Sequence, residues 1–359
     1  HLYFAVNIHL VELGIWVILF GYLLGQFIYI PLSKRFNTVI SLRLGLVILL
    51  IAYALLRLAI LRHWFWLFQL GELITGLGIA SCYCCTYAIL NRHCSHEQVK
   101  RTLPYVIFAY AIFGSLATWI SSILSQHGHW QSNIDVIPCV TIIAFAVSWL
   151  FHPSRLPAPL PPPQHQKNST NYWVLLTYGL GLGVVDYMGY GYPSAMPLLS
   201  TQIMHIHLST YGIYTVYTGV LAVVPAFFLS YYSLKKLGAR QSFIYSMLTN
   251  ILLIIIIYSL RFIPHRVVIP VFICVAFLNI VAAVSLISAA YLASNASSNK
   301  QYAASLMGFL NMGAILVGLL IQDTLPVFAF TAFLAVSFGL LCLALIASLI
   351  ENRDKHSYN

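Results

Sequence analysis

Charged residues are scarce in this sequence, and acidic residues are the scarcest. Only 7% of the 359 residues are Asp, Glu, Lys or Arg, and only 8 residues are acids, whereas 60% are hydrophobic. A soluble globular protein of this length needs a polar surface that such a composition cannot supply. Together with a mean hydropathy of +0.86, the composition predicts a protein whose surface is surrounded by lipid.

The sequence also lacks the signatures of three other classes. Polar and apolar residues do not alternate with a period of two, which argues against a membrane barrel. The 7 cysteines fall mostly inside apolar runs, so they do not indicate the disulfide framework of a small secreted protein. No catalytic pair such as an HExxH helix occurs, and we therefore do not expect an enzyme.

Two features could indicate other ligands, and neither is convincing. Cys82, Cys84 and Cys85 precede His93 and His96, but neighbouring helical positions point in different directions and give no tetrahedral metal site. We therefore predict no metal and no cofactor. The formal net charge of +10 could indicate nucleic acid, yet no basic stripe lies on a polar segment. We expect no nucleic-acid partner.

About eleven apolar runs are long enough to cross a hydrocarbon core of ~30 Å, which takes about 20 helical residues. They lie near residues 10–32, 39–60, 64–90, 103–124, 134–151, 172–198, 211–233, 243–262, 267–291, 303–322 and 325–350. Because backbone groups in lipid must be paired within the segment, we expect these runs to be helices. The predicted fold class is an all-α membrane protein.

Lysine and arginine concentrate in alternate loops between these runs. One set of loops contains Lys34, Arg35, Arg92, Lys100, Arg101, Arg155, Lys167, Lys235, Lys236, Arg240, Lys300, Arg353 and Lys355. The other set contains little beyond Arg62, Arg261 and Arg266. Under the positive-inside rule the first set faces the cytoplasm. This pattern predicts a multi-pass protein of the inner (cytoplasmic) membrane.

A polar, proline-rich segment at residues 152–171 divides the chain. It is too short for a domain, so we interpret it as a cytoplasmic linker. It would join an N-terminal bundle at 1–151 to a C-terminal bundle at 172–350, with a cytoplasmic tail at 351–359. About five spans precede the linker and about six follow it. We expect a first helix that is absent from this sequence, and the alternative is an eleven-span chain.

Two cationic turns occupy corresponding places in the two halves. The first ends the segment at residues 25–36 and the second covers residues 233–240. Each lies between two apolar runs, as expected for a membrane hairpin with its turn in the cytoplasm. Related halves in one chain are typical of secondary transporters. The repeat therefore predicts a carrier.

The first turn and the helix before it resemble a known family. The segments Val11-Glu12, Tyr22-Leu23-Leu24-Gly25-Gln26 and Pro31-Leu32-Ser33-Lys34-Arg35-Phe36 resemble the second helix and following loop of the major facilitator superfamily. The closest likeness is to twelve-span drug:proton antiporters of the bicyclomycin-resistance type. Further resemblances lie at residues 76–80, 88–92, 129–131, 192–194 and 305–309. The resemblance implies the major facilitator fold, two helical bundles with pseudo-two-fold symmetry, and a monomer that exports a drug or metabolite in exchange for protons.

The sequence departs from the family pattern at several positions. In the first turn, Lys34 stands where the family usually has an acid, and Asn37 stands where it usually has glycine. The resemblance implies a conformational latch at Lys34, Arg35 and Arg43, in an altered form. In the fourth family helix Glu72 replaces the usual arginine. These motifs alone therefore do not imply proton antiport.

Four acids fall within predicted spans, and Glu12 and Asp135 lie near the beginnings of theirs. Glu72 and Asp186 lie deeper, where a charge costs ~2.5–3.5 kcal/mol and tends to face a cavity or a partner. We predict Asp186 as the proton or cation site, because glycines flank it and permit a flexible or broken helix. The alternative is a structural acid bonded within the bundle. We predict that Glu72 shares the proton cycle or binds a cationic substrate. Its alternative is an ion pair with Arg43 or Arg57.

Aromatic and amide side chains are the candidates for binding a substrate. They recur at roughly helical spacing as Tyr22, Gln26 and Tyr29, then as Tyr187 and Tyr190, and then as Tyr211, Tyr214 and Tyr217. Phenol rings and amides suit small amphipathic organic molecules. The alternative is that these tyrosines pack helices or mark the membrane interface.

Three functions therefore remain open. The first is a secondary exporter in which two bundles alternate around a midplane site and exchange a proton for an organic substrate. The second is an importer, a symporter or an uncoupled facilitator of a small solute, which the altered latch favours. The third is a carrier-shaped protein that does not transport.

Overall fold

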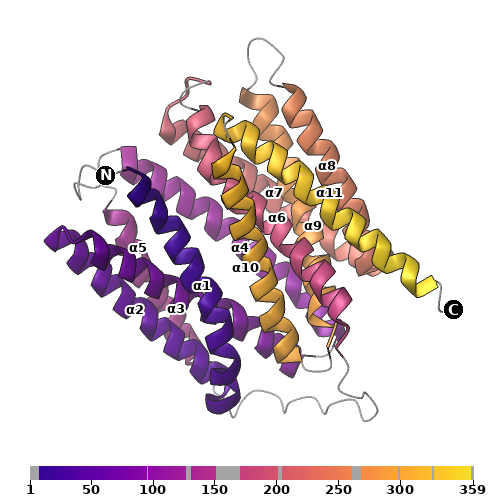
Figure 1. Ribbon diagram of the computed structural model, residues 1–359, viewed down its shortest axis with the longest axis horizontal. Coiled ribbons are helices and arrows are strands. Elements are labelled where there is room, and N and C mark those ends of the chain that lie inside the picture. The colour runs from indigo at the N-terminus through magenta and orange to yellow at the C-terminus, as the bar shows by residue number, and fades with distance from the viewer. Residues whose placement is uncertain are drawn as a thin grey trace. The chain divides into compact units, whose positions relative to one another are not determined.

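The computed structural model describes residues 8–94, 96–126, 131–150, 170–200, 204–260, 268–297, 300–325 and 327–356. Within these ranges the chain forms eleven α-helices (Figure 1). They are α1 Ile8–Phe36, α2 Thr38–Arg62, α3 Phe65–His93, α4 His96–Gln126, α5 Ser132–Ser148, α6 Tyr172–Leu198, α7 Leu208–Lys236, α8 Ala239–Leu260, α9 Val268–Ser294, α10 Lys300–Thr324 and α11 Ala329–His356. The predicted all-α class is confirmed, and each predicted span matches one helix. Most of the predicted linker lies outside the described residues.

Seven of the described helical segments are long and apolar enough to cross a membrane. They are Thr38–Arg62, Phe65–Leu90, Ser209–Lys236, Ala239–Leu260, Val268–Ser294, Tyr302–Thr324 and Ala329–Glu351. Shorter apolar stretches lie at Gly14–Tyr29, Ile112–Ser125 and Ser132–Ser148. Large apolar side chains remain exposed on these helices, and Leu61 and Trp66 are each 74% exposed. Such side chains suit a surface solvated by lipid.

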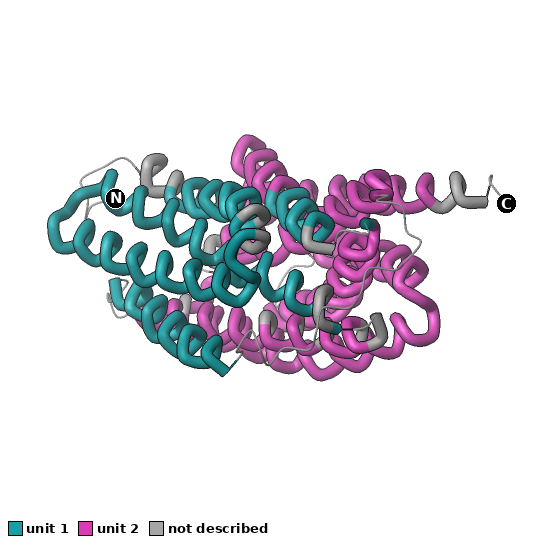
Figure 2. Tube along the Cα trace, turned by 90° about the horizontal axis from the view of Figure 1, so that it is seen from below, with its two compact units in different colours: residues 1–95, 129–169, 297–312 teal, residues 96–128, 170–296, 313–359 magenta. Residues whose placement is uncertain are grey.

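The contacts divide the chain into two compact units that interleave along the sequence (Figure 2). The first unit comprises residues 1–95, 129–169 and 297–312, and the second comprises residues 96–128, 170–296 and 313–359. Helix α4 therefore packs with the second unit, although the sequence places it before the linker. The predicted bundles are defined by their order along the sequence, whereas the two units are defined by contacts between residues. The contacts therefore do not test the predicted bundle boundaries, which stay a prediction.

In the first unit, α3 lies side by side with α1 and α2 (Figure 1). Glycines permit the close approach of α1 and α3, because Gly21 and Gly25 of α1 face Gly76 and Ala80 of α3. A Cβ atom added at Gly76 would overlap the backbone of α1, where the Tyr22 nitrogen would lie only 2.6 Å away. Small residues four positions apart allow this packing in lipid, where helices gain little hydrophobic energy by associating.

Replacing Gly76 by alanine is expected to destabilise the first unit by about 1–3 kcal/mol, the usual range for overpacking. The new methyl group must displace backbone, which cannot rotate away as a side chain can. Thermal unfolding of the purified protein in detergent measures the loss. Gly339→Ala in α11 is the matched control, because a Cβ atom there meets nothing within 4 Å. Equal losses for both variants would contradict the close-packing argument.

The two cationic turns share an unusual backbone residue. Asn37 connects α1 to α2 with φ 69°, and Gly238 connects α7 to α8 with φ 79°. A residue in this region reverses the chain between two helices without a longer loop. With ψ 145°, Asn37 lies outside the left-handed helical region that asparagine tolerates, in a conformation that glycine adopts without strain and other residues rarely adopt. The Asn37 side chain also accepts a hydrogen bond from the Val39 backbone nitrogen at 3.2 Å. The backbone conformation at residue 37 therefore explains why the family usually has glycine at this position.

Asn37→Gly is expected to stabilise the protein by up to about 1 kcal/mol. The substitution removes backbone strain of about 1–3 kcal/mol. This gain is offset in part by the flexibility that glycine loses on folding, about 0.5–1 kcal/mol, and by a weaker N-cap, which costs about a few tenths of a kcal/mol. Asn37→Ala loses the cap and keeps the strain, so its melting temperature should fall. If both variants melt below the parent protein, the side-chain cap outweighs the backbone strain and the expectation is wrong.

Candidate functional site

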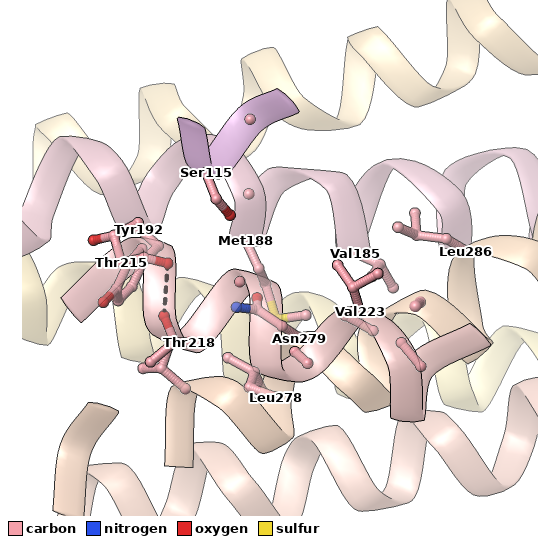
Figure 3. A pocket seen from close by; sticks show the side chains of 18 of the residues that line it. Ser115, Val185, Met188, Tyr192, Thr215, Thr218, Val223, Leu278, Asn279 and Leu286 are labelled. Atoms are coloured by element: carbon pink, nitrogen blue, oxygen red, sulfur yellow. Dashed lines mark hydrogen bonds between the residues drawn. The ribbon is translucent and has the colours of Figure 1, made fainter. Parts of the chain in front are cut away.

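The second unit contains a cavity of about 480 Å³ between α4, α6, α7 and α9. This volume lies within the range of ~300–1,000 Å³ that is typical of small-molecule sites. Figure 3 shows that the cavity has two chemically different ends. Ser115, Tyr192, Thr215 and Thr218 lie toward one end, and Val185, Val223 and Leu286 lie toward the other. Asn279 and Met188 lie between them.

Asp186 is contributed to this cavity by α6. It is half-buried, and it is the one charged side chain among the described residues that line the cavity. Helix α6 is continuous from Tyr172 to Leu198, so the break that the glycines permit is not present in this structure. Two of those glycines instead serve packing, because a side chain at Gly181 would collide with Phe243 and one at Gly191 with Gln322.

Three threonines of the lining use their hydroxyl protons within their own helices. Thr118 donates to the Gly114 carbonyl, Thr215 to the Tyr211 carbonyl and Thr218 to the Thr215 carbonyl, each at 3.0 Å. Such back-bonding is common for threonine inside helices. A hydroxyl oxygen that has donated its proton still accepts hydrogen bonds. These side chains therefore offer acceptors to any molecule in the cavity.

The tyrosines predicted on α6 and α7 do not line this cavity. Tyr187 is fully buried and donates to Gln322 Oε1 at 2.6 Å, so it faces α10. Tyr211 and Tyr214 contact the Phe272 ring, with centroids 6.4 and 4.9 Å away. Tyr217 is 60% exposed. Tyr190 lies one turn beyond Asp186 and interacts with it electrostatically.

The candidates on α1 are packed inside the first unit. Tyr22 contacts the Tyr83 ring edge to face at 6.3 Å. Gln26 is fully buried and accepts a hydrogen bond from the Cys84 thiol. The Tyr29 hydroxyl lies against Gly45 of α2, where an added Cβ atom would be 2.9 Å from it. These three side chains join α1 to its neighbours, and their role in binding a substrate stays a prediction.

Glu72 lies half-buried on α3, and the two arginines considered as its partners are engaged elsewhere. Arg57 Nε lies 3.0 Å from Asp135 Oδ1. Arg43 donates to the Ser148 carbonyl at 3.0 Å. The alternative of an ion pair between Glu72 and either arginine is therefore wrong. Within the described part of the chain, Glu72 forms neither an ion pair nor a hydrogen bond.

The predicted latch residues differ in their surroundings. The Arg43 guanidinium lies 4.2 Å from the Trp149 ring centroid and binds the carbonyl end of α5. A cation is favourable there because the helix dipole places negative charge at the C-terminus. Arg35 is exposed and lies 5.4 Å from the Phe36 ring. The Lys34 side chain lies outside the described residues.

A buried ion pair in the second unit was missed by the sequence analysis. Glu351 is only 3% exposed and forms an ion pair with Arg240 at the start of α8. Tyr178 of α6 donates to the same carboxylate at 3.2 Å. The predicted tail begins at residue 351, but α11 continues to His356. The sequence signal that could have indicated this ion pair is Arg240, a basic residue of the second cationic turn.

The cavity lining beyond α6 was also missed. Asn279 is an isolated amide within the apolar sequence of α9, and polar residues inside spans are functional candidates by default. Thr215 and Thr218 of α7 lie beside the predicted Tyr214 and Tyr217. The predicted Tyr214 and Tyr217 therefore share one segment of α7 with the lining residues Thr215 and Thr218, but they do not line the cavity.

Comparisons with known proteins identify a family and a fold. The sequence profile described as Major Facilitator Superfamily matches residues 2–322. A bacterial homologue of the iron transporter ferroportin, in an outward-facing state, is 13% identical in sequence and superposes with a TM-score of 0.71. The match covers 97% of this chain and 91% of the homologue. The proton:xylose symporter XylE, bound to 6-bromo-6-deoxy-D-glucose, is 14% identical with a TM-score of 0.72, covering 98% and 88%.

A variant of the E. coli fucose:proton symporter FucP is 14% identical with a TM-score of 0.66, covering 96% of this chain and 91% of its own. At such identities the likeness shows the fold alone. A comparison with curated proteins found no match. The predicted major facilitator fold is confirmed.

Proposed function

The chain belongs to the major facilitator superfamily, and from this premise we propose that it exports a small amphipathic organic compound in exchange for protons. As a member of this family it is a multi-pass membrane transporter rather than an enzyme. The proposal adds the direction, the coupling ion and the kind of substrate. It also adds the inner (cytoplasmic) membrane as the location and a monomer as the working form.

The observation that carries the proposal is the position of Asp186. A carboxyl group in a membrane-length helix is retained at a cost in free energy, which favours a functional role. Asp186 also borders a cavity of about 480 Å³ whose lining is mostly apolar. One ionisable group beside an apolar chamber meets the two needs of a proton-coupled carrier, a place for the proton and a place for the substrate.

The exchange follows from alternating access. When the cavity opens to the more acidic side, Asp186 takes up a proton and becomes neutral. When it opens to the other side, the proton leaves and the carboxylate is available for the next cycle. A carrier that changes its access only with one of its two ligands bound couples their movements. Each turnover then drives the substrate outward at the expense of the proton gradient.

Glu72 is the candidate for a second proton site. It lies in the first unit, half-buried, with no ion pair or hydrogen bond to another described residue. A charged carboxyl group without a counter-ion is costly in an apolar environment. Glu72 would therefore exchange a proton whenever water reaches it. It would set the proton stoichiometry, while Asp186 couples the proton to the substrate.

Proteoliposomes with a trapped pH-sensitive dye test the function. Addition of fluorescent amphipathic compounds, both cationic and neutral, should release protons in the opposite direction to substrate movement, and an imposed pH gradient should concentrate a substrate against its own gradient. Proton movement in the same direction would show a symporter. Substrate equilibration without proton movement would show a facilitator, and either result would overturn the antiport proposal.

A further inference from the structure

The cavity of the second unit has a lining that selects one kind of ligand. Resting on the proposed function, which places the substrate in this cavity, we propose that the ligand is a protonated primary or secondary amine with an apolar body. Three properties of the lining lead to this class: its charge, its hydrogen-bonding groups and its apolar side chains.

The charge of the lining is negative. Asp186 is its one ionisable acid, and among the described lining residues there is no lysine, arginine or histidine. An anionic ligand would lose its hydration and face a carboxylate, with no cation of the lining to compensate, and both effects oppose binding. A cationic ligand is instead attracted to the carboxylate across the cavity. Charge alone therefore excludes organic acids and phosphates and favours cations.

The hydrogen-bonding character separates one cation from another. Thr118, Thr215 and Thr218 have already donated their hydroxyl protons to helix carbonyls, so their oxygens can only accept. The Asp186 carboxylate, when ionised, also only accepts. A ligand that fits these oxygens must bring donors of its own, while the Tyr192 hydroxyl and the Asn279 nitrogen are donors that the same lining offers. A primary or secondary ammonium has N–H donors, whereas a quaternary ammonium has the same charge and none.

The apolar side chains of the lining favour an amine that has an apolar body. Phe108, Phe113 and Phe227 line the cavity together with aliphatic side chains, and Val185, Val223 and Leu286 form its apolar end (Figure 3). A sugar would bring many hydroxyl groups to this surface and leave most of them unpaired. Each such unpaired group opposes binding, because its lost hydration is not replaced. An aromatic or aliphatic body instead gains from burial.

Asn279 fits the same ligand class as a positioning group. Its amide lies between the polar and apolar ends in Figure 3. An amide has both acceptor and donor atoms, so Asn279 can accept from an ammonium N–H while its own nitrogen donates elsewhere. The amide thereby extends the row of acceptors from the threonines toward the middle of the cavity.

Four probes on one scaffold test the proposal by equilibrium binding to purified protein in lipid nanodiscs. They are 4-phenylbutylamine, its N,N,N-trimethyl derivative, 4-phenylbutanol and 4-phenylbutyrate. Isothermal titration at one fixed pH should rank them in that order, with the amine at least about tenfold tighter than the quaternary ion, since a hydrogen bond to a charged group is worth that much. The butyrate should not bind. Preference for the alcohol, the butyrate or D-xylose over the amine would overturn the inference.

Two variants locate the binding in this cavity. Asp186→Asn should weaken the amine at least about tenfold and leave the alcohol unchanged. Thr218→Val keeps the shape and removes one acceptor, so it should weaken the amine and leave the quaternary ion unchanged. Thr249→Val is the matched control, because Thr249 is back-bonded in the same way but exposed on α8. Asp323→Asn, at an exposed acid of α10, controls for net charge.

These binding experiments do not depend on transport, so the two proposals can fail separately. If amines bind with the expected ranking but no protons move in proteoliposomes, the proposed ligand class is supported and the proposed antiport mechanism is contradicted. Proton-coupled export of a sugar or a carboxylate would do the reverse. If Asp186→Asn does not fold, the ratio of amine to quaternary-ion affinity in Thr218→Val still decides the inference.

Discussion

Asp186→Asn is expected to reduce proton-coupled export to the level of protein-free liposomes. Asparagine has nearly the same size as aspartate, so the α6 backbone and the cavity should keep their shape. The amide neither binds nor releases a proton, and the protein then has no means at this position of linking the proton gradient to the substrate. Dye-reported proton release on addition of a transported substrate is the measurement.

Two further variants show whether the effect belongs to this carboxyl group. Asp323→Asn removes an exposed acid of the same unit and should keep full proton release. Glu72→Gln should change the number of protons moved per substrate without abolishing the movement. The reverse outcome, in which Glu72→Gln abolishes coupling and Asp186→Asn retains it, would move the coupling site to α3 and contradict the role given to Asp186.

The helices could be predicted from the sequence because lipid imposes a simple rule. A span must contain about 20 apolar residues and must pair its own backbone groups. Run lengths alone therefore locate most of the described helices, although α4 begins well before its predicted span and α11 continues beyond its predicted end. The turn at Asn37 could be recognised as a special position because its family counterpart is glycine. The same reasoning placed residue 351 outside the last span, since a glutamate normally ends an apolar run, and the contact with Arg240 was not visible.

The faces of the helices could not be predicted in the same way. In a soluble protein the polar side of a helix identifies its buried side, but in lipid the outward, packed and cavity-facing sides are all largely apolar. Neighbouring residues differ by about 100° around a helix axis. Asp186 therefore borders the cavity while Tyr187 is buried against α10. Only the contacts among α4, α6, α7 and α9 reveal which threonines share a chamber.

Arg240→Met is expected to destabilise the second unit by about 3–5 kcal/mol, the range for removing one member of a buried ion pair. The substitution removes the counter-ion of a carboxyl group that is only 3% exposed, whereas the hydrogen bond from Tyr178 can remain. Glu351→Met should cost less, because the Arg240 side chain is 23% exposed and keeps some access to water. Thermal unfolding in detergent measures both losses. Tyr178→Phe removes one neutral donor and should cost about 1 kcal/mol.

The double variant Arg240→Met/Glu351→Met decides whether the charge or the packing is responsible. If the cost of each single variant comes from the charge left behind, removing both charges should recover much of the stability, and the double variant should lose less than the sum of the two. The thioether side chains preserve most of the packing volume at the junction of α8 and α11. Strictly additive losses would mean that each side chain contributes independently through packing. The ion pair would then have no coupling energy of its own.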